Sequence, residues 1–215
     1  YRRVMRNEAL LAGRLRHPHI VGVYDADGEA SPPYIVLEYI EGAPLSRFTK
    51  SDRLLPPAQV LDICYKVCSA MEHAHEHGLV HRDIKPANLM LQTNGDVKLT
   101  DFGMALATEG DVTQIGGIVG SPQYMSPEQV REEPCTWRSD MFSLGVVVYE
   151  LLTGRRPFEG ESDYSTLFKI TNDHPILPST LRPGLPEQVD KVLMRAMAKD
   201  PQARFQRWMD FAESL

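Results

Sequence analysis

The sequence has few cysteines and few tryptophans, three and two respectively in 215 residues. Cys64, Cys68 and Cys135 do not have the number or the spacing of a disulfide framework, which excludes a small disulfide-stabilised secreted domain. Cys64 and Cys68 are four residues apart on one face of an expected helix. We therefore interpret them as reduced core thiols of a cytoplasmic protein.

The sequence also lacks a long hydrophobic run and an excess of positive charge. Its longest apolar run, Met141 to Leu152, is interrupted by Ser143 and Glu150 and is too short to span a bilayer. The 23 Lys and Arg residues face 29 Asp and Glu residues, which gives a net charge of −6. We expect no nucleic-acid partner and no membrane contact from this segment.

No signal peptide opens the chain, and Tyr1 is not an initiator methionine. We therefore expect the chain to start partway into a longer protein. The composition, 42% hydrophobic and 24% charged, is that of an ordinary globular protein with a sizeable core. The length suits one domain, or a large domain with a small partner.

Three histidines, His73, His75 and His77, superficially resemble a metal site. They lack the paired cysteines or the acidic cluster that zinc sites require, and we do not expect zinc there.

The first part of the chain predicts a small, partly stranded unit. Residues 1–16 have the apolar spacing of an amphipathic helix, and residues 20–24 and 34–39 are strand-like. Glu8 lies within the apolar stripe of that helix and has no basic residue three or four positions away. Either its carboxylate escapes to the edge of the stripe, or it pairs with a cation from elsewhere in the protein.

Helices dominate from Pro56 onward. The first is predicted to end at Gly78, a typical C-terminal capping residue. Ser139–Thr153 is apolar on nearly all sides, which indicates a buried central helix. Later helices are predicted at Ser165–Asn172, Pro186–Ala198 and Trp208–Leu215. These patterns together predict an α+β protein with a small stranded piece and a larger helical one.

A hairpin is predicted between the two helical regions. Residues 89–92 and 97–100 are β-prone and flank Asn94-Gly95, the favoured pair for a two-residue type I′ turn. With such a turn, residue 92 faces residue 97. Continuing the ladder places Asn88 opposite Asp101, with their Cβ atoms about 4.5–5.5 Å apart.

A carboxylate beside an amide oxygen at the end of a strand forms a hard-oxygen site that suits Mg²⁺. Asp83 precedes Asn88 by five residues, on the loop that leads into the hairpin, and can share a cleft with it. The stretch VHRDIKPANLM (residues 80–90) thus supplies a base, a cation and a metal ligand to one site.

Several motifs resemble those of protein kinases, in the same order over nearly the whole chain. HRDIKPAN (His81–Asn88) resembles the catalytic loop, Asp101-Phe102-Gly103 the metal-binding DFG motif, and Ser126-Pro127-Glu128 a variant of APE. HPHIV, RSDMFSLG and DPQARF, starting at residues 17, 138 and 200, also resemble the family. The closest resemblance is to the eukaryotic-like Ser/Thr protein kinases of bacteria.

This resemblance implies an α+β, bilobal protein-kinase-like fold with a mostly helical C-lobe and a truncated, β-containing N-lobe. Residues 1–37 would form a partial N-lobe with helix C and the following strands, and residues 38–43 the hinge. Residues 44–215 would form the C-lobe, with an activation segment at 101–128.

The resemblance also implies the cofactors ATP and Mg²⁺ and protein substrates. Asp83 would accept the proton of the substrate hydroxyl, and Lys85 would steady the transferring γ-phosphate. Asn88 and Asp101 would hold two Mg²⁺ ions. Glu8 would be the helix-C glutamate, whose cation is a lysine on the preceding strand.

Further residues acquire expected roles only through the resemblance. Leu37 matches the gatekeeper, and residues 38–40, from Glu38 to Ile40, match the hinge that offers backbone groups to adenine. Met90 would pack beneath the adenine ring. His81 and Phe102 suit the apolar spine of the active enzyme.

Regulation is expected in the glycine-rich connection between residues 101 and 128. Arg82 would pair with a phosphate on this segment, and Thr113, followed by Thr108, is our candidate for phosphorylation. Ser121 matches the residue that contacts both Asp83 and Lys85.

Two expected roles are structural. Asp140 would brace the backbone of the catalytic loop, and Glu128 would pair with Arg204. Removing one partner of a buried ion pair costs about 3–5 kcal/mol.

No Gly-rich phosphate loop and no lysine precede Glu8 in this sequence. We therefore expect weak nucleotide binding and little or no turnover from these residues alone. The alternative is a pseudokinase that acts as a binding scaffold, although a scaffold has no need of Asp83, Lys85, Asn88 and Asp101 together. A small-molecule phosphotransferase is disfavoured by the long connection. The resemblance also implies a kinase homodimer and a membrane anchor in the parent protein as further expectations.

Overall fold

The structure is a computed structural model that describes residues 15–27, 30–32, 34–101, 106–107 and 122–215. Most of the predicted helix at residues 1–16 lies outside these ranges. The same holds for five residues with predicted roles: Glu8, Phe102, Thr108, Thr113 and Ser121.

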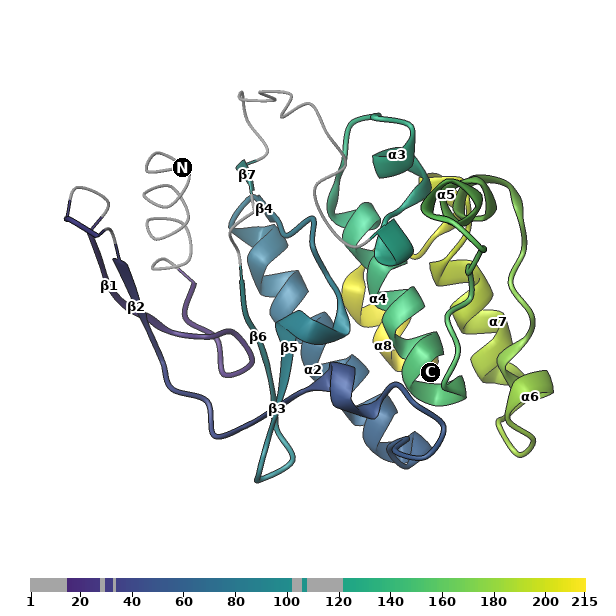
Figure 1. The fold of residues 1–215 in the computed structure, drawn as a ribbon, viewed down its shortest axis with the longest axis horizontal. Helices are drawn as coiled ribbons and strands as arrows, with labels where there is room; N and C mark the ends of the chain where they lie inside the picture. The colour runs from purple at the N-terminus through teal and green to yellow at the C-terminus, as the bar shows by residue number, and fades with distance from the viewer. Residues whose placement is uncertain (1–14, 28–29, 33, 102–105, 108–121) are drawn as a thin grey trace.

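Two strands form a small antiparallel sheet that projects to one side of the molecule (Figure 1). Strand β1 (Val23–Asp27) pairs with β2 (Tyr34–Leu37), so that Val23 lies opposite Leu37. The first strand was predicted at residues 20–24, but it begins at Val23, and Ile20 and Val21 lie beside β6 instead. The Val21 N–H donates to the carbonyl of Leu99, 2.9 Å away, and this bond joins the segment to the larger part of the protein.

A second sheet has the order β3-β5-β6, with all pairs antiparallel. Its strands are β3 (Gly42–Pro44), β5 (Leu89–Gln92) and β6 (Val97–Leu99). Strand β3 was not predicted. It depends on glycine at position 42, because a Cβ atom there would collide with the backbone of Leu91 on the neighbouring strand.

The predicted type I′ turn of the β5–β6 hairpin is wrong. Gln92 N donates to Asp96 O at 2.7 Å and Gly95 N to Gln92 O at 3.0 Å, so three residues, 93–95, form the loop. Gly95 has φ +88°, the left-handed conformation that such a loop needs at its last position. The ladder is consequently shifted by one residue, and Asn88 bonds to Thr100 instead of facing Asp101.

The hydrophobic pattern explains the observed register. Leu89 lies opposite Leu99 and Leu91 opposite Val97, so four buried side chains share one face of the hairpin. The predicted register would have placed buried Leu91 opposite half-buried Lys98. A shift of one residue moves side chains to the wrong face, which a sheet with one buried face does not tolerate.

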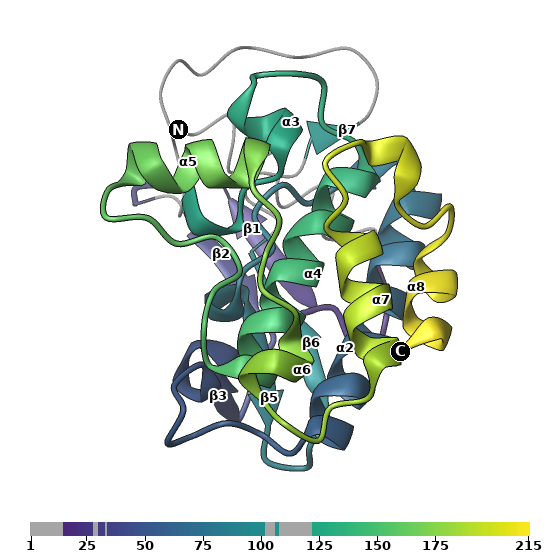
Figure 2. The same cartoon turned by 90° about the vertical axis from the view of Figure 1, so that its right-hand side faces the viewer.

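The larger part of the molecule is helical and is organised around α4 (Trp137–Thr153), whose residues from Ser139 to Thr153 are all buried. Thr136 caps its N-terminus, and Gly154, at φ +73°, ends it. In Figure 2, α4 lies among helices α2 (Pro57–Glu76), α7 (Glu187–Ala196) and α8 (Trp208–Ser214). The core of the protein lies between these helices and the buried face of the β5–β6 hairpin.

The helices predicted from Pro56 onward are present, and each of their ends either coincides with the prediction or differs from it by one or two residues. The helix predicted at Ser165–Asn172 is α5 (Asp163–Asn172). The remaining elements are short: β4 (Leu79–Val80), β7 (Leu106–Ala107), α3 (Pro127–Val130), α6 (Pro178–Leu181) and several 3₁₀ turns. Within the described ranges, no helix has the length and apolar character needed to cross a membrane. The architecture is α+β, with a mostly helical larger part and a small β-containing part.

Candidate active site

The loop that carries Asp83 follows β4 and is fixed to the buried helix α4. The backbone N–H groups of His81 and Arg82 donate to the two carboxylate oxygens of Asp140, each at 2.7 Å. Arg82 has φ +67°, a conformation that non-glycine residues adopt only when their surroundings enforce it. Asp140 on α4 supplies that enforcement, and the loop therefore keeps its shape.

Asp140 itself is only 1% exposed. Burial raises its pKa from 3.8 to about 7, against the effect of the two N–H donors and of the nearby Arg82 guanidinium, which favour the carboxylate. Part of the stability of this brace is thus sensitive to pH.

His81 is fully buried and held at both ring nitrogens. Its Nε2 lies 3.1 Å from the carbonyl of Thr100, which can only accept, while its Nδ1 accepts from the Asp83 N–H at 3.3 Å. These bonds require the neutral ring with its proton on Nε2. Burial lowers the pKa of His81, in agreement with the neutral form. The histidine thus aligns the backbone of Asp83 with the end of the hairpin.

Asp83, Lys85 and Asn88 meet at one carboxylate oxygen. Oδ2 of Asp83 lies 2.6 Å from the Lys85 ammonium and accepts from the Asn88 amide at 3.0 Å. The same amide also donates to the carbonyl of Asp83 at 2.9 Å. The side chains of Asp83 and Lys85 are 15% and 21% exposed, so these two groups are partly shielded but reachable, whereas Asn88 is buried.

Asp101 follows directly on the residue that bonds to Asn88. The carbonyl of Asn88 accepts from both the N–H and the hydroxyl of Thr100, at 2.9 and 3.1 Å. Asp101 is exposed and has φ +61°, a second left-handed residue that is not glycine. In the observed register, the Asp101 backbone therefore still lies next to the start of β5, close to Asn88 in the ladder.

The amide oxygen of Asn88 and the carboxylate of Asp101 are donor groups of the kind that Mg²⁺ takes. The amide nitrogen of Asn88 is bound to Asp83, which leaves the amide oxygen as its possible metal ligand. Among the described residues, no group of three or more His, Cys, Asp or Glu side chains is arranged to hold a metal ion. Mg²⁺ needs no such cage, because it usually takes one or two carboxylates together with waters and phosphate oxygens.

Of the predicted nucleotide-facing residues, Leu37 lies on β2, Glu38 and Ile40 lie in the connection that follows it, and Met90 lies on β5. Leu37 ends β2 and is 46% exposed, and Ile40 is half-buried. The Glu38 N–H donates to the carbonyl of Gly22 at 2.8 Å. Met90 is half-buried on the face of β5 opposite to its buried neighbours.

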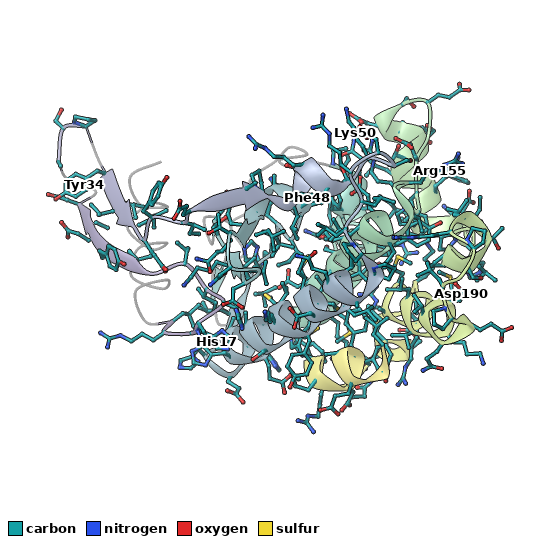
Figure 3. All side chains as sticks on the ribbon, turned by 90° about the horizontal axis from the view of Figure 1, so that it is seen from below. His17, Tyr34, Phe48, Lys50, Arg155 and Asp190 are labelled. Carbon is teal, nitrogen blue, oxygen red and sulfur yellow. The ribbon has the colours of Figure 1, made fainter. Side chains whose placement is uncertain are left out.

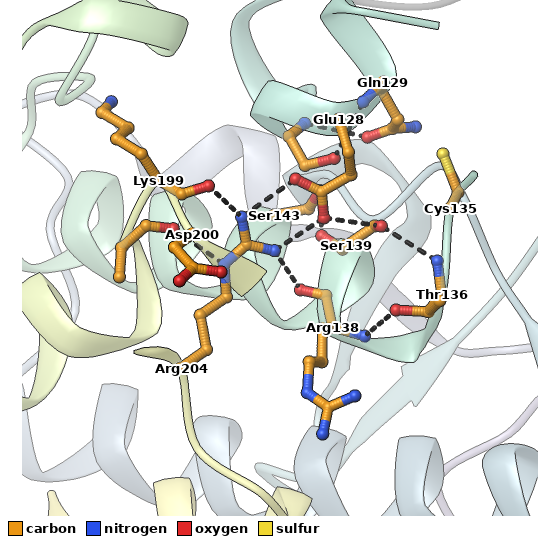
Figure 4. A network of polar contacts seen from close by, with 12 residues as sticks. Glu128, Gln129, Cys135, Thr136, Arg138, Ser139, Ser143, Lys199, Asp200 and Arg204 are labelled. Atoms are coloured by element: carbon orange, nitrogen blue, oxygen red, sulfur yellow. Dashed lines mark hydrogen bonds and ion pairs between the residues drawn. The ribbon is translucent and has the colours of Figure 1, made fainter. Parts of the chain in front are cut away.

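Glu128 and Arg204 form a bidentate ion pair in the interior (Figure 4). The two carboxylate–guanidinium distances are 2.7 and 2.9 Å, and Arg204 is 0% exposed. Arg204 also donates to the carbonyls of Ala198 and Arg138, each at 2.8 Å, and Glu128 accepts from the Ser139 hydroxyl. Burial raises the pKa of Glu128, but the Arg204 guanidinium, a backbone N–H and the Ser139 hydroxyl together lower it below its ordinary value. This pair connects α3 to α4 and to the chain before α8.

Sequence reasoning missed two supporting residues, Gln129 for the loop that carries Asp83 and Lys98 for the connection after β2. The Gln129 side chain donates to the carbonyl of Arg82 at 3.0 Å and completes a capping box with Ser126. The spacing of Ser126 and Gln129 is a recognisable capping signal, but nothing in the sequence indicates the contact with Arg82. Lys98 binds Glu38 at 2.9 Å, a contact that likewise has no local signal.

One hydrogen-bond donor of the Arg82 guanidinium has no partner among the described residues. This donor is Nε, which is buried. Buried donors of this kind normally have a partner.

The chain is similar to known protein kinases over nearly all of its length. The sequence profile of the protein kinase domain matches residues 2–213. Serine/threonine-protein kinase PknB of Mycobacterium leprae is 43% identical, covering 94% of this chain and 33% of the relative. A probable serine/threonine-protein kinase of Corynebacterium efficiens is 41% identical, covering 100% of this chain and 34% of the relative.

A probable serine/threonine-protein kinase of Streptomyces coelicolor is 42% identical over 94% of this chain and 31% of the relative. The chain thus spans about a third of the length of the curated relatives it matches. The family match, the identities and the ordered loop motifs agree: the chain belongs to the protein kinase family, among the eukaryotic-like Ser/Thr kinases of bacteria.

Proposed function

We propose that the protein transfers the γ-phosphate of ATP to serine and threonine hydroxyls of other proteins. The observation that carries this proposal is the contact of Lys85 and Asn88 with a single oxygen of Asp83. A carboxylate in such a position can act as a base while a cation beside it attracts phosphate. In phosphoryl transfer the protein mainly positions groups and neutralises charge, and these three residues do both.

In the proposed reaction, Asp83 accepts the proton of the substrate hydroxyl while the hydroxyl oxygen attacks the γ-phosphorus. The bond from the γ-phosphorus to the bridging oxygen of ADP breaks, and ADP leaves with the electron pair. Lys85 balances charge on the transferred phosphoryl group, and Asn88 holds Asp83 in place. Mg²⁺, held by Asp101 and the amide oxygen of Asn88, would neutralise charge on the phosphates.

Adenine would lie against the strand connection, with Leu37 as the gatekeeper and Met90 below the ring. The N–H of Glu38 is bound to Gly22, so its carbonyl is the group that it can offer to a base. The N–H of Ile40 would supply the matching donor. In this arrangement residues 38–43 form the hinge between a small lobe at residues 1–37 and a large lobe at residues 44–215, with the activation segment at 101–128.

Arg82 supports control by phosphorylation. A phosphate on the segment 101–128 would satisfy its buried Nε and would favour one arrangement of that segment. Thr113 is the first candidate acceptor and Thr108 the second. Mass spectrometry of active protein that finds no phosphate between Thr108 and Ser121 would contradict this part of the proposal.

The wider protein would act in the cytoplasm, where ATP is available, and a membrane anchor and homodimerisation are proposed for it by likeness to relatives.

The remaining site residues have supporting roles in this proposal. Glu8 would pair with a strand lysine, and His81 and Phe102 would join the apolar spine. Ser121 would contact Asp83 and Lys85.

The test uses the protein with its natural flanking sequence, ATP–Mg²⁺ and a generic basic protein as the phosphate acceptor. Asp83→Asn should lower the transfer rate by about 10²- to 10⁴-fold, the usual contribution of a general base. Asp96→Asn is the matched control, because Asp96 is a partly exposed carboxylate bound to Lys66 at the loop end of the β5–β6 hairpin, whereas Asn88 lies at the opposite end. Transfer that survives Asp83→Asn would remove Asp83 from its role, and a wild type without any transfer would favour the pseudokinase.

A further inference from the structure

A contact between Glu38 and Lys98 joins three segments that are distant in the sequence. One oxygen of the Glu38 carboxylate accepts from the Lys98 ammonium at 2.9 Å and from the Gly22 N–H at 3.0 Å. The backbone N–H of Glu38 donates to the Gly22 carbonyl at 2.8 Å. Glu38 is thus tied at both its side chain and its backbone, to the segment before β1 and to strand β6.

The ion pair between Glu38 and Lys98 is partly buried. The Lys98 and Glu38 side chains are only 13% and 25% exposed, so water screens them less than a surface pair. Although burial raises the pKa of the Glu38 carboxyl, the Lys98 ammonium and the Gly22 N–H lower it more. The carboxylate is therefore charged and paired at neutral pH.

On one side of the contact the chain is bonded to the large sheet, and on the other side β1 and β2 project away from the rest of the protein. Backbone bonds between Leu99 and both His19 and Val21 hold the segment before β1 against β6, which belongs to the sheet of the large part. Beyond this point β1 and β2 extend away from the helices, with Tyr34 near their outer end and His17 near their base (Figure 3). Glu38 lies where the chain leaves β2, so its anchoring fixes the course of the connection.

We propose that Glu38 and Lys98 act as a positioning pair that orients the Glu38 carbonyl for the amino group of adenine. The proposal rests on the proposed function, since it assigns a purpose to the pair within the nucleotide site. The Glu38 N–H is bound to Gly22, so only the carbonyl can face a base, and a carbonyl can only accept. The amino group is the donor that adenine offers. Fixing the carbonyl in advance lowers the ordering cost of binding.

Two variants test the pair in the protein with its natural flanking sequence. Lys98→Met keeps the apolar stem and removes the charge, and Glu38→Gln keeps an acceptor for Gly22. Lys66→Met is the matched control, because Lys66 also forms a short ion pair with the same hairpin, to Asp96 at 2.7 Å, but not with the connection. Affinity is measured by calorimetry for ADP and for purine riboside diphosphate, which lacks the amino group.

Lys98→Met and Glu38→Gln should each raise the Kd for ADP about two- to fivefold, as expected for a partly exposed pair. The double variant should be no weaker than either single variant, since both remove the same contact. Neither change should alter the Kd for purine riboside diphosphate, because that ligand has no amino group to donate a hydrogen bond to the Glu38 carbonyl. Amide exchange at residues 20–24 and 36–40 should be faster in Lys98→Met than in Lys66→Met.

An unchanged Kd for ADP in Lys98→Met would overturn the proposal, as would an equal loss for both nucleotides or an equal effect of Lys66→Met. These outcomes leave the proposed function intact. A wild-type protein that binds no ADP would instead overturn the proposed function together with the positioning role.

Discussion

The ion pair between Glu128 and Arg204 provides the sharpest prediction for stability. The perturbation is Arg204→Met, which preserves most of the length and apolar volume of the side chain and removes its charge. The variant leaves the Glu128 carboxylate, only 3% exposed, with the Ser139 hydroxyl as a remaining donor at 2.8 Å. The carbonyls of Ala198 and Arg138 lose a donor as well.

The expected magnitude follows from the cost of an uncompensated buried charge. Breaking a buried pair by removing one partner costs about 3–5 kcal/mol. A domain of this kind is stable by only about 5–15 kcal/mol, so the variant should lose a large share of its stability. Replacing both partners, in Glu128→Leu with Arg204→Met, removes the stranded charge. The double variant should therefore be more stable than Arg204→Met alone.

Urea unfolding followed by tryptophan fluorescence measures these differences. Trp137 and Trp208 are the two tryptophans, and their ring centroids lie 6.2 Å apart in the helical part. Arg53→Met, which removes an exposed pair with Asp52, is the control and should change stability by less than about 0.5 kcal/mol. A loss below about 1 kcal/mol for Arg204→Met, or a double variant that loses the sum of both single losses, would refute the reasoning.

Two further predictions concern helix α4. Since folding raises the pKa of Asp140 from 3.8 to about 7, the folded state retains between these values a proton that the unfolded chain has released, and stability should fall as pH rises through this window. Asp140→Asn should flatten that fall in urea titrations at pH 4 to 7, and identical slopes would contradict the raised pKa. Thr136→Ala removes the cap that accepts from the Arg138 N–H and should cost about 1 kcal/mol by thermal or urea unfolding, whereas Thr180→Ala, outside any cap of α4, should not affect that helix.

The sequence predicted the long helices well because their signal is local and repeated. Residues 57–76 keep apolar side chains at helical spacing, and Gly78, at φ +71°, follows the helix end as expected. Helix α4 was predicted from continuous apolar character and was found with its whole length from Ser139 buried. Errors were confined to the ends, where capping contacts decide the boundary.

The hairpin shows where local reasoning failed. Asn94-Gly95 suits both a two-residue and a three-residue loop, because each places Gly95 at positive φ. The choice between them depends on which register pairs buried residues with buried ones. The alternation of Leu89 and Leu91 against Val97 and Leu99 contained that information, and weighing it against the turn would have given the observed register.

Short elements and left-handed residues could not be predicted, for a related physical reason. Strand β3 consists of three residues that pair only because β5 lies beside them, and its sequence has no strand signal of its own. Arg82 and Asp101 hold φ +67° and +61°, although neither is a glycine. Local preference opposes both conformations, so they persist only through contacts made across the fold.

The candidate site therefore depends on distant support more than on its own motif. The Arg82 backbone is held by Asp140, 58 positions away, and by the Gln129 side chain, 47 positions away. Both supports are fixed in turn by α4 and by the capping box that begins α3. The order of residues in the motif brings Asp83, Lys85 and Asn88 within reach of one another. The buried helix behind them gives the loop a single shape, so a change at Asp140 should disturb the position of Asp83 without touching it.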